Sequence, residues 1–200
     1  MATVEFFFDC SSPWTYLGFE SIQPIAASDD IEFIWKPFLV GGVFNTVNPS
    51  VYENRERPVP VKQRYYGKDL QDWADFVGIS IGNPPVFPVN SVKVMRGAFV
   101  AIEEGCLVPY ARAAFDSYWS ELRDISQDEE VTAIAQSAGL DVDTFWNKIG
   151  SQEYKDRLRA NTDELIERGG FGSPTSFIDG DDMYFGNDRM PLIERKLGLS

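Results

Sequence analysis

Strand-forming runs occur at the two ends of this chain, and a long stretch of helical patterns separates them. The strand candidates span residues 3–9, 31–38, 175–178 and 183–185, and helical patterns accompany them over residues 16–27 and 191–197. The sequence D-G-D-D between the last two strand candidates is typical of a hairpin turn. This order predicts one sheet that is assembled from both ends of the chain and interrupted by helices.

The middle of the chain has apolar residues at helical spacing. Helices are expected over residues 63–77, 92–104, 111–123, 128–139 and 151–168, with a short one that Asp141 or Asp143 caps and that runs to Lys148. In the third of these, one face carries Phe115, Tyr118, Trp119 and Leu122, which favours burial in the core over a ligand site. Residues 41–60 are rich in Gly, Asn and Pro and predict a surface loop around the charged run E-N-R-E-R.

The composition limits the possible partners. Hydrophobic residues make up 44% of the 200 residues, which is enough to bury a core in one domain or in one domain with a large insertion. The formal net charge of -13 repels nucleic-acid phosphates and anionic lipid surfaces. No run approaches the roughly 18 apolar residues of a membrane span, and the first residues lack the features of a secretory signal. We therefore expect no nucleic-acid partner, no membrane partner and a cytoplasmic location.

The reactive side chains are few. Histidine is absent, which excludes Ser-His-Asp and Cys-His nucleophilic mechanisms and zinc sites built on histidine. Cys10 and Cys106 lie far apart and do not form a C-x-x-C pair, so neither a disulfide framework nor a metal site is indicated. Any chemistry must use hydroxyls, carboxylates, backbone amides, Lys or Arg, or a reagent from outside the chain.

The first strand candidate ends in the sequence D-C-S-S-P. Ser12 is a favoured N-cap residue and Pro13 suits the first helical position, so a helix is expected to begin here. A helix N-terminus attracts anions through its free N–H groups and its dipole. Ser-Pro is also common as a plain helix start, so both a structural cap and a reactive helix start are open at this point. Cys10 is expected to be a small buried apolar residue and not a nucleophile.

Four sequence blocks carry a resemblance to a known family. The run F-F-F-D-C-S-S-P-W-T-Y-L-G resembles the signature D-x-x-S-P-[aromatic]-[small]-Y-L of the 2-hydroxychromene-2-carboxylate isomerases and the kappa-class glutathione transferases. The block F-G-S-P-T at residues 171–175 is similar to the segment that holds a cis-proline in the thioredoxin superfamily. G-N-D-R at 186–189 and F-P-V-N-S at 87–91 resemble two further motifs of the family. The blocks follow one another in the family's order and cover nearly the whole chain.

This resemblance implies an α/β fold, namely a thioredoxin-like fold with a large all-helical insertion domain, as in DsbA-like proteins and kappa-class glutathione transferases. Residues 1–40 and 165–200 would form the discontinuous thioredoxin-like domain, and residues 41–164 the helical insertion. A homodimer is implied as well. In DsbA-like oxidoreductases the position of Ser12 is the first cysteine of C-x-x-C and that of Thr15 the second. The resemblance therefore implies that glutathione, as cofactor, supplies the reactive sulfur.

The same resemblance implies a catalytic residue and a binding site. Ser12 would be catalytic, because its hydroxyl can donate a hydrogen bond to a thiolate at the helix N-terminus. The residues implied to bind glutathione are Ser12, Pro13, Trp14, Asn48, Lys62, Phe171, Ser173, Pro174, Asn187 and Asp188. Structural alternatives remain for several of them. Pro174 can be a plain turn proline, Asp188 a helix cap and Lys62 a solvated lysine. Phe171 and Trp14 can be ordinary core.

The implied activity is a glutathione-dependent isomerisation in aromatic catabolism. It would interconvert 2-hydroxychromene-2-carboxylate, or a similar aromatic compound, and trans-o-hydroxybenzylidenepyruvate by thiolate addition, bond rotation and elimination. Lys62 and Arg64 are candidates to hold the substrate carboxylate. One alternative is a kappa-like glutathione transferase or peroxidase. Another, which is not an enzyme, is a thioredoxin-fold binding module that lacks redox cysteines.

Overall fold

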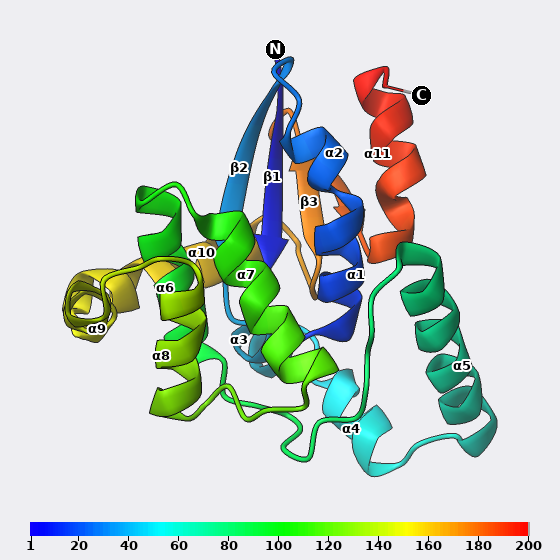
Figure 1. Cartoon of the computed structure of the whole chain (residues 1–200). Helices are drawn as coiled ribbons and strands as arrows, with labels where there is room; N and C mark the ends of the chain where they lie inside the picture. Colours follow the sequence, from blue (N-terminus) through cyan, green and yellow to red (C-terminus); the bar gives the residue numbers. More distant parts are fainter. Residues whose placement is uncertain (200) are drawn as a thin grey trace.

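A four-stranded mixed sheet joins the two ends of the chain (Figure 1). The computed structural model describes residues 1–199. The sheet has the order β2-β1-β3-β4, in which β1 pairs in parallel with β2 and antiparallel with β3, and β3 pairs antiparallel with β4. The strands are β1 (Ala2–Phe8), β2 (Ile31–Pro37), β3 (Thr175–Ile178) and β4 (Asp182–Phe185). All four predicted strands are confirmed, and the sheet places the first strand beside the third.

The three consecutive phenylalanines of β1 explain why helices cover both faces of the sheet. Successive side chains of a strand point to opposite faces. Phe6 and Phe8 lie in the main apolar cluster, whereas Phe7 lies in a second cluster with Leu165 and Phe177. In Figure 1, α1 (Pro13–Ser21) and α7 (Leu107–Phe115) lie in front of the sheet, and α10 (Gln152–Glu167) lies behind it. A strand buried on both faces therefore reads as a continuous apolar run.

The helix predicted over residues 16–27 is found as two helices. They are α1 and α2 (Gln23–Ala26). The first begins at Pro13 because Ser12 caps it. The break follows from Pro24, which has no amide hydrogen and whose ring crowds the carbonyl four residues earlier.

The prediction of a surface loop over residues 41–60 is wrong. This segment contains α3 (Val40–Thr46) and α4 (Ser50–Glu56). Val40 and Val43 are buried in the second apolar cluster beside Leu165 of α10. Packing of this apolar face outweighs the low helix propensity of the two glycines between the valines.

The central segment is helical as expected, with one local difference. Its elements are α5 (Pro60–Val77), α6 (Val92–Glu103), α7, a π-helical turn (Asp116–Ser120), α8 (Asp128–Ser137) and α9 (Val142–Gly150). Of the predicted face, Phe115, Tyr118 and Trp119 are buried, but Leu122 is 38% exposed and has a φ of 61°. The three aromatic residues are in the core as expected. The wider π-helical turn displaces the residues that follow it, so Leu122 does not share the buried face with them.

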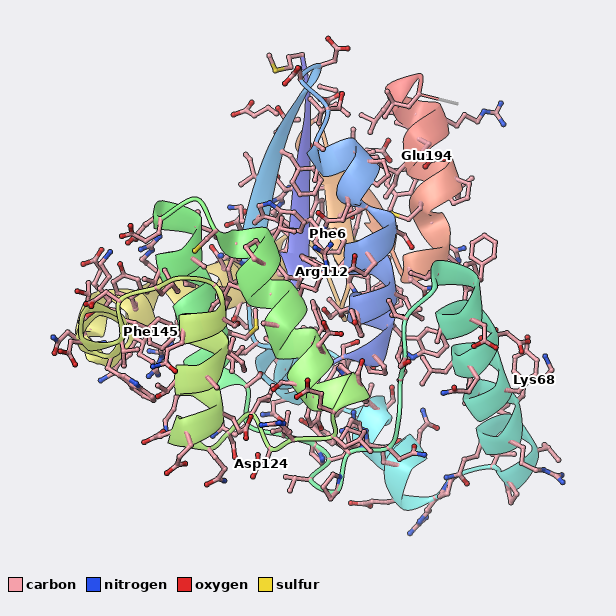
Figure 2. All side chains as sticks on the ribbon, viewed as in Figure 1. Phe6, Lys68, Arg112, Asp124, Phe145 and Glu194 are labelled. Carbon is pink, nitrogen blue, oxygen red and sulfur yellow. The ribbon has the colours of Figure 1, made fainter. Side chains whose placement is uncertain are left out.

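One apolar cluster continues from the sheet into the central helices. It contains Phe6 of β1 and Phe145 of α9, both labelled in Figure 2. An ion pair adds to this contact, with Arg112 Nε of α7 lying 2.7 Å from Glu20 Oε1 of α1. The division into residues 1–40 with 165–200 and residues 41–164 stays a prediction. No helix among residues 1–199 is long and apolar enough to cross a membrane.

The chain closes with a short 3-10 turn and a helix beside the sheet. The turn, labelled η2, spans Asn187–Arg189, and α11 spans Met190–Leu197. The latter agrees with the helix expected over residues 191–197. Gly186 precedes the turn with a φ of 109°, a conformation that side chains other than glycine rarely adopt.

A charged cluster around Glu103 ties three central helices together and gives a pH-dependent prediction. Glu103 of α6 pairs with Arg157 of α10 and lies 2.9 Å from Lys148 Nζ of α9. Partial burial by itself raises the pKa of Glu103. Hydrogen bonds from Tyr154, Lys148 and Arg157 outweigh this effect and lower the pKa to about 2. A lowered pKa stabilises the fold above the unfolded value of 4.5, and this contribution is lost as the pH falls toward 2.

We therefore expect Glu103→Gln to lower the free energy of unfolding by about 1 kcal/mol at pH 7, by less at pH 3 and by little at pH 2. Urea unfolding of both proteins across this pH range measures the difference. The matched control is Glu104→Gln, since Glu104 is exposed and lies 3.5 Å from Lys148 Nζ. An equal loss of stability at pH 7 and pH 3 would contradict the prediction.

Candidate functional site

Ser12 lies at the junction between β1 and α1, directly before the first residue of α1. As N-cap of α1, its Oγ accepts a hydrogen bond from Thr15 N at 3.2 Å. Its hydroxyl also donates to Ser173 O, but at 3.4 Å, which is longer than a normal O–H···O bond. The cap predicted from the sequence is confirmed, and the half-buried hydroxyl keeps a donor that a closer acceptor can take.

The first turn of α1 offers a further donor. Pro13 has no N–H, and the amides of Thr15 and Tyr16 both donate to Ser12 O, at 3.1 and 3.2 Å. The N–H of Trp14 has no acceptor among residues 1–199. Because the N-terminal end of a helix also carries partial positive charge, the Ser12 hydroxyl and the Trp14 amide together favour a bound anion.

The loop before β3 lies against this helix start. The Ser173–Pro174 peptide bond is cis, as the sequence block at residues 171–175 implies. The Ser173 hydroxyl lies 2.6 Å from Thr15 Oγ1 and accepts a hydrogen bond from Asp9 N at 3.2 Å. Gly18 allows the close approach of α1, because a Cβ there would lie 2.8 Å from Pro174 Cγ. The structure therefore brings Ser12, Ser173 and Pro174 together.

The G-N-D-R segment lies next to Pro174, since Gly186 N donates to Pro174 O at 3.1 Å. A Cβ on Gly18 would lie 3.7 Å from the Cα of Asn187, so this buried residue is also next to α1. Asp188 is exposed and forms an ion pair with Arg189 at 2.7 Å. The residue at the N-cap of α11 is Arg189, and no side chain of the described residues caps that helix. The alternative role of Asp188 as a helix cap is therefore not found.

Asn48 and Phe171 meet at the start of the same loop. The side chain of Asn48, between α3 and α4, donates from Nδ2 to Phe171 O at 3.1 Å. The Phe171 ring is 39% exposed and packs on Phe185 with ring centroids 4.4 Å apart. Trp14 is half-buried against the main apolar cluster. The structure therefore brings Asn48 to Phe171, two residues before Ser173, and leaves the Phe171 ring partly exposed.

Lys62 is not brought into contact with this group. It lies exposed in the first turn of α5, and no hydrogen bond or ion pair joins it to another described residue. Figure 1 shows α5 beginning at the lower right, away from the start of α1. The role of Lys62 as a ligand stays a prediction.

Cys10 is fully buried in the main apolar cluster. Its backbone N–H lies 3.4 Å from Met95 Sδ, and its carbonyl accepts from Trp119 Nε1 at 3.0 Å. Burial, together with the negative charge of Asp9, raises the pKa of the Cys10 thiol well above its usual value. Since the thiolate is the nucleophilic form, Cys10 is an inert core residue at neutral pH.

We expect Cys10→Ala to leave kcat and KM unchanged within about twofold, and to lower stability by about 1 kcal/mol through the small cavity that it creates. Steady-state kinetics and thermal unfolding measure the two effects. In the folded wild type, a thiol reagent is expected to modify the half-exposed Cys106 first. A large loss of turnover in a folded Cys10→Ala protein would contradict this placement.

Asp9 is a residue at this junction that sequence reasoning missed as part of the site. Its carboxylate is buried, with Oδ1 accepting from Ser11 N and Oδ2 from Val40 N, each at 2.9 Å. Burial raises the pKa of Asp9, although the hydrogen bonds from these amides oppose the shift. The available signal was an acidic residue directly after three consecutive phenylalanines, a place where a charge needs partners. Asp9 fixes the position of the loop that carries Ser12.

Residues 3–198 match the family model described as "DSBA-like thioredoxin domain". A 2-hydroxychromene-2-carboxylate isomerase of Pseudomonas putida is 31% identical over 202 residues, covering 98% of this chain and 94% of that protein. Glutathione S-transferase kappa 2 of Caenorhabditis elegans is 30% identical over 208 residues, covering 95% and 89%. A solved structure of a 2-hydroxychromene-2-carboxylate isomerase superposes with a TM-score of 0.82 at 28% identity, covering 98% and 94%. The predicted fold class is thereby confirmed.

Proposed function

The chain belongs to the DSBA-like thioredoxin family, within the group of isomerases and kappa-class transferases that its sequence resembles, and from this membership we propose that it is a glutathione-dependent isomerase. Its substrate is 2-hydroxychromene-2-carboxylate or a similar aromatic compound. The relatives that it matches over nearly their whole length are named as isomerases and transferases, which supports an enzyme.

The observation that carries this proposal is the serine at the start of α1. Ser12 presents a hydroxyl 3.4 Å from the Ser173 carbonyl, next to the N–H of Trp14, which has no acceptor among residues 1–199. The N–H of Ser173 likewise has no acceptor among the described residues, so both sides of this junction offer backbone groups to a peptide. These donors fit a thiolate on a short peptide, and neither Cys10 nor Cys106 has a lowered thiol pKa that would make it a substitute.

The residues proposed to hold glutathione are assigned to different parts of the tripeptide. Ser12, with the amide of Trp14, faces the sulfur, and the backbone of Ser173 pairs with the cysteinyl unit. Asn187 and Asp188 suit the γ-glutamyl end, because a carboxylate binds its ammonium group. The remaining residues are Asn48 and Lys62 for a carboxylate, and Pro13, Trp14, Phe171 and Pro174 as walls.

The chain's contribution to catalysis is the stabilisation of negative charge on sulfur. Glutathione, when bound, would supply a thiolate nucleophile for reversible addition to a conjugated carbon of the substrate, and Ser12 with the Trp14 amide would hold that sulfur. The Ser12 hydroxyl and the Trp14 amide lower the thiol pKa by donating to the charged form. A shift from about 8.5 to about 6.5 raises the thiolate fraction at pH 7 from roughly 3% to roughly 75%.

A spectrophotometric assay with 2-hydroxychromene-2-carboxylate tests the proposal. We expect isomerisation whose rate depends on glutathione, while titration of thiols shows that none is consumed. Stoichiometric loss of glutathione with a chlorinated aromatic electrophile, and no isomerisation, would instead support a kappa-like transferase, the second candidate that the similarity to the kappa-class protein favours. Absence of glutathione binding in calorimetry would contradict both and support a binding module. The homodimer stays a prediction.

A further inference from the structure

A cavity of about 370 Å³ lies between α3, α6 and α10, and no part of the proposed reaction uses it. From α10, it is lined by Gln152, Lys155, Asp156, Arg159 and Asp163, which share one helical face. Val92 and Arg96 of α6 form a second wall, and Leu39 with α3 a third. Its volume is in the range of small-molecule sites.

The cavity gathers basic side chains that have no carboxylate partner. More than half of the 18 basic residues of the chain form ion pairs with described residues. Arg96, Lys155 and Arg159 form neither an ion pair nor a side-chain hydrogen bond with any residue from 1 to 199, yet all three line this cavity. Arg96 is half-buried, whereas Lys155 and Arg159 are exposed. In a protein with a net charge of -13, these three cations give the cavity a local positive charge that favours an anion.

Of the three basic residues that line the cavity, Arg96 gives the strongest indication of a bound ligand. Its Nε is buried and has no hydrogen-bond partner among the described residues. Burial lowers the pKa of this guanidinium, because the charged form loses water without gaining a partner. A buried donor without an acceptor destabilises a protein, and an arginine fork matches a carboxylate with two parallel hydrogen bonds.

The other lining residues indicate which kind of anion the cavity suits. Two carboxylates, Asp156 and Asp163, also line the cavity, and Asp156 Oδ1 already accepts from Gln152 Nε2 at 2.7 Å. With three cations against two carboxylates, the lining suits a single negative charge better than a multiply charged ion. Leu39, Val92, Leu158 and Ile166 contribute apolar walls, which suit a hydrocarbon body.

We propose that this cavity binds a small organic monocarboxylate with an apolar body, whose carboxylate is held by Arg96. The site is separate from the one around Ser12, because the described lining residues include none of those proposed to hold glutathione. The two regions are nevertheless connected, because two consecutive backbone amides form hydrogen bonds to them. Leu39 N donates to Thr162 Oγ1 at 3.1 Å on the cavity side, and Val40 N donates to Asp9 Oδ2 on the other.

Titration of the ¹⁵N-labelled full chain with benzoate, without glutathione, tests the site by amide chemical shifts. We expect the largest shifts at amides of α3, α6 and α10 and not at residues 12–15. Benzyl alcohol has the ring without the charge, and inorganic phosphate has the charge without the ring. Each is expected to bind at least about tenfold more weakly than benzoate. Because the probe is unreactive and glutathione is absent, the result is independent of the proposed isomerase activity.

Three variants assign the binding to the cavity. Arg96→Gln is expected to weaken benzoate about tenfold or more, and Arg159→Gln about threefold. The matched control is Arg195→Gln, which removes an exposed cation of α11 outside the cavity and is expected to change nothing. Without benzoate, Arg96→Gln is expected to unfold at no lower temperature than the wild type, since it removes a buried donor that has no partner.

Several results would overturn the proposal. They are shifts confined to residues 12–15, equal binding of phosphate or benzyl alcohol, and wild-type affinity in both cavity variants. A strong loss of stability in Arg96→Gln would assign that residue a structural role instead. If Arg96→Gln does not fold, wild-type affinity in the Arg159→Gln protein is sufficient to reject the site.

Discussion

Ser12→Ala is expected to lower kcat/KM for the isomerisation by about 100-fold, the effect of removing one preorganised donor from a developing negative charge. The variant loses the hydroxyl that lies beside the free Trp14 amide and the Ser173 carbonyl. We also expect the thiol pKa of bound glutathione to rise, so that the pH at which activity reaches half its maximum moves upward. Steady-state kinetics from pH 5 to 9 and thiolate absorbance of the complex measure these effects.

The fold of this variant is expected to survive. Loss of the hydrogen bond from Thr15 N to Ser12 Oγ removes an N-cap, which costs about 1 kcal/mol. The matched control is Ser11→Ala, because this neighbouring serine does not cap α1 and its backbone N–H, which donates to Asp9 Oδ1 at 2.9 Å, is kept in the variant. Wild-type turnover in a folded Ser12→Ala protein would refute the role assigned to Ser12.

Asp9→Ala is expected to destabilise the protein by about 3 kcal/mol, which corresponds to a fall in Tm of roughly 6–12 °C for a chain of this size. The substitution leaves the N–H groups of Ser11 and Val40 without their acceptor in a buried place. It also releases the loop before Ser12, so we expect turnover to fall in the fraction that remains folded. Thermal unfolding followed by circular dichroism measures the first effect, and kinetics well below the new Tm the second.

The raised pKa of Asp9 sets the direction of a pH effect. Since the folded-state pKa lies above that of the unfolded chain, the contribution of Asp9 to stability is fully present below the unfolded pKa and is lost as the pH rises through the folded pKa. The stability advantage of the wild type over Asp9→Asn, which does not titrate, should therefore grow as the pH falls from neutrality toward about 4.

The control for Asp9→Ala is Asp181→Ala, because Asp181 is exposed in the hairpin turn. A stability loss in Asp9→Ala no larger than in this control would reject the role of the buried carboxylate.

The strands and caps were predictable because their signals are local. The three phenylalanines of β1 indicate burial on both faces, and Ser12 with Pro13 indicates a helix start, in each case within a few neighbouring residues. The segment after β2 was misread for the opposite reason. Its glycines are poor helix formers, and the contact that makes α3 helical is with Leu165, far away in the sequence.

The candidate site was predictable only in part. The sequence blocks named Ser12, Ser173, Pro174 and Asn187, and the structure places them around one end of α1. Asp9 was missed because its importance depends on two amides that meet its carboxylate, one of which belongs to Val40. The role of Arg96 could not be predicted for the same kind of reason. A single arginine on a helix gives no sign that its Nε will be buried without a hydrogen-bond partner among the described residues.

The sequence by itself determined the order of the four strands, the start of α1 at a serine instead of a cysteine, and the absence of histidine and of a dithiol. These features depend on residue identity and on neighbours within one turn, where capping, proline geometry and strand alternation act. Only the tertiary structure decided which buried polar groups are satisfied. The Asp9 carboxylate accepts hydrogen bonds from two amides, whereas Arg96 Nε has no hydrogen-bond partner among the described residues. The reason is that burial is set by packing between distant segments, and each buried polar atom depends on the partners that this packing provides.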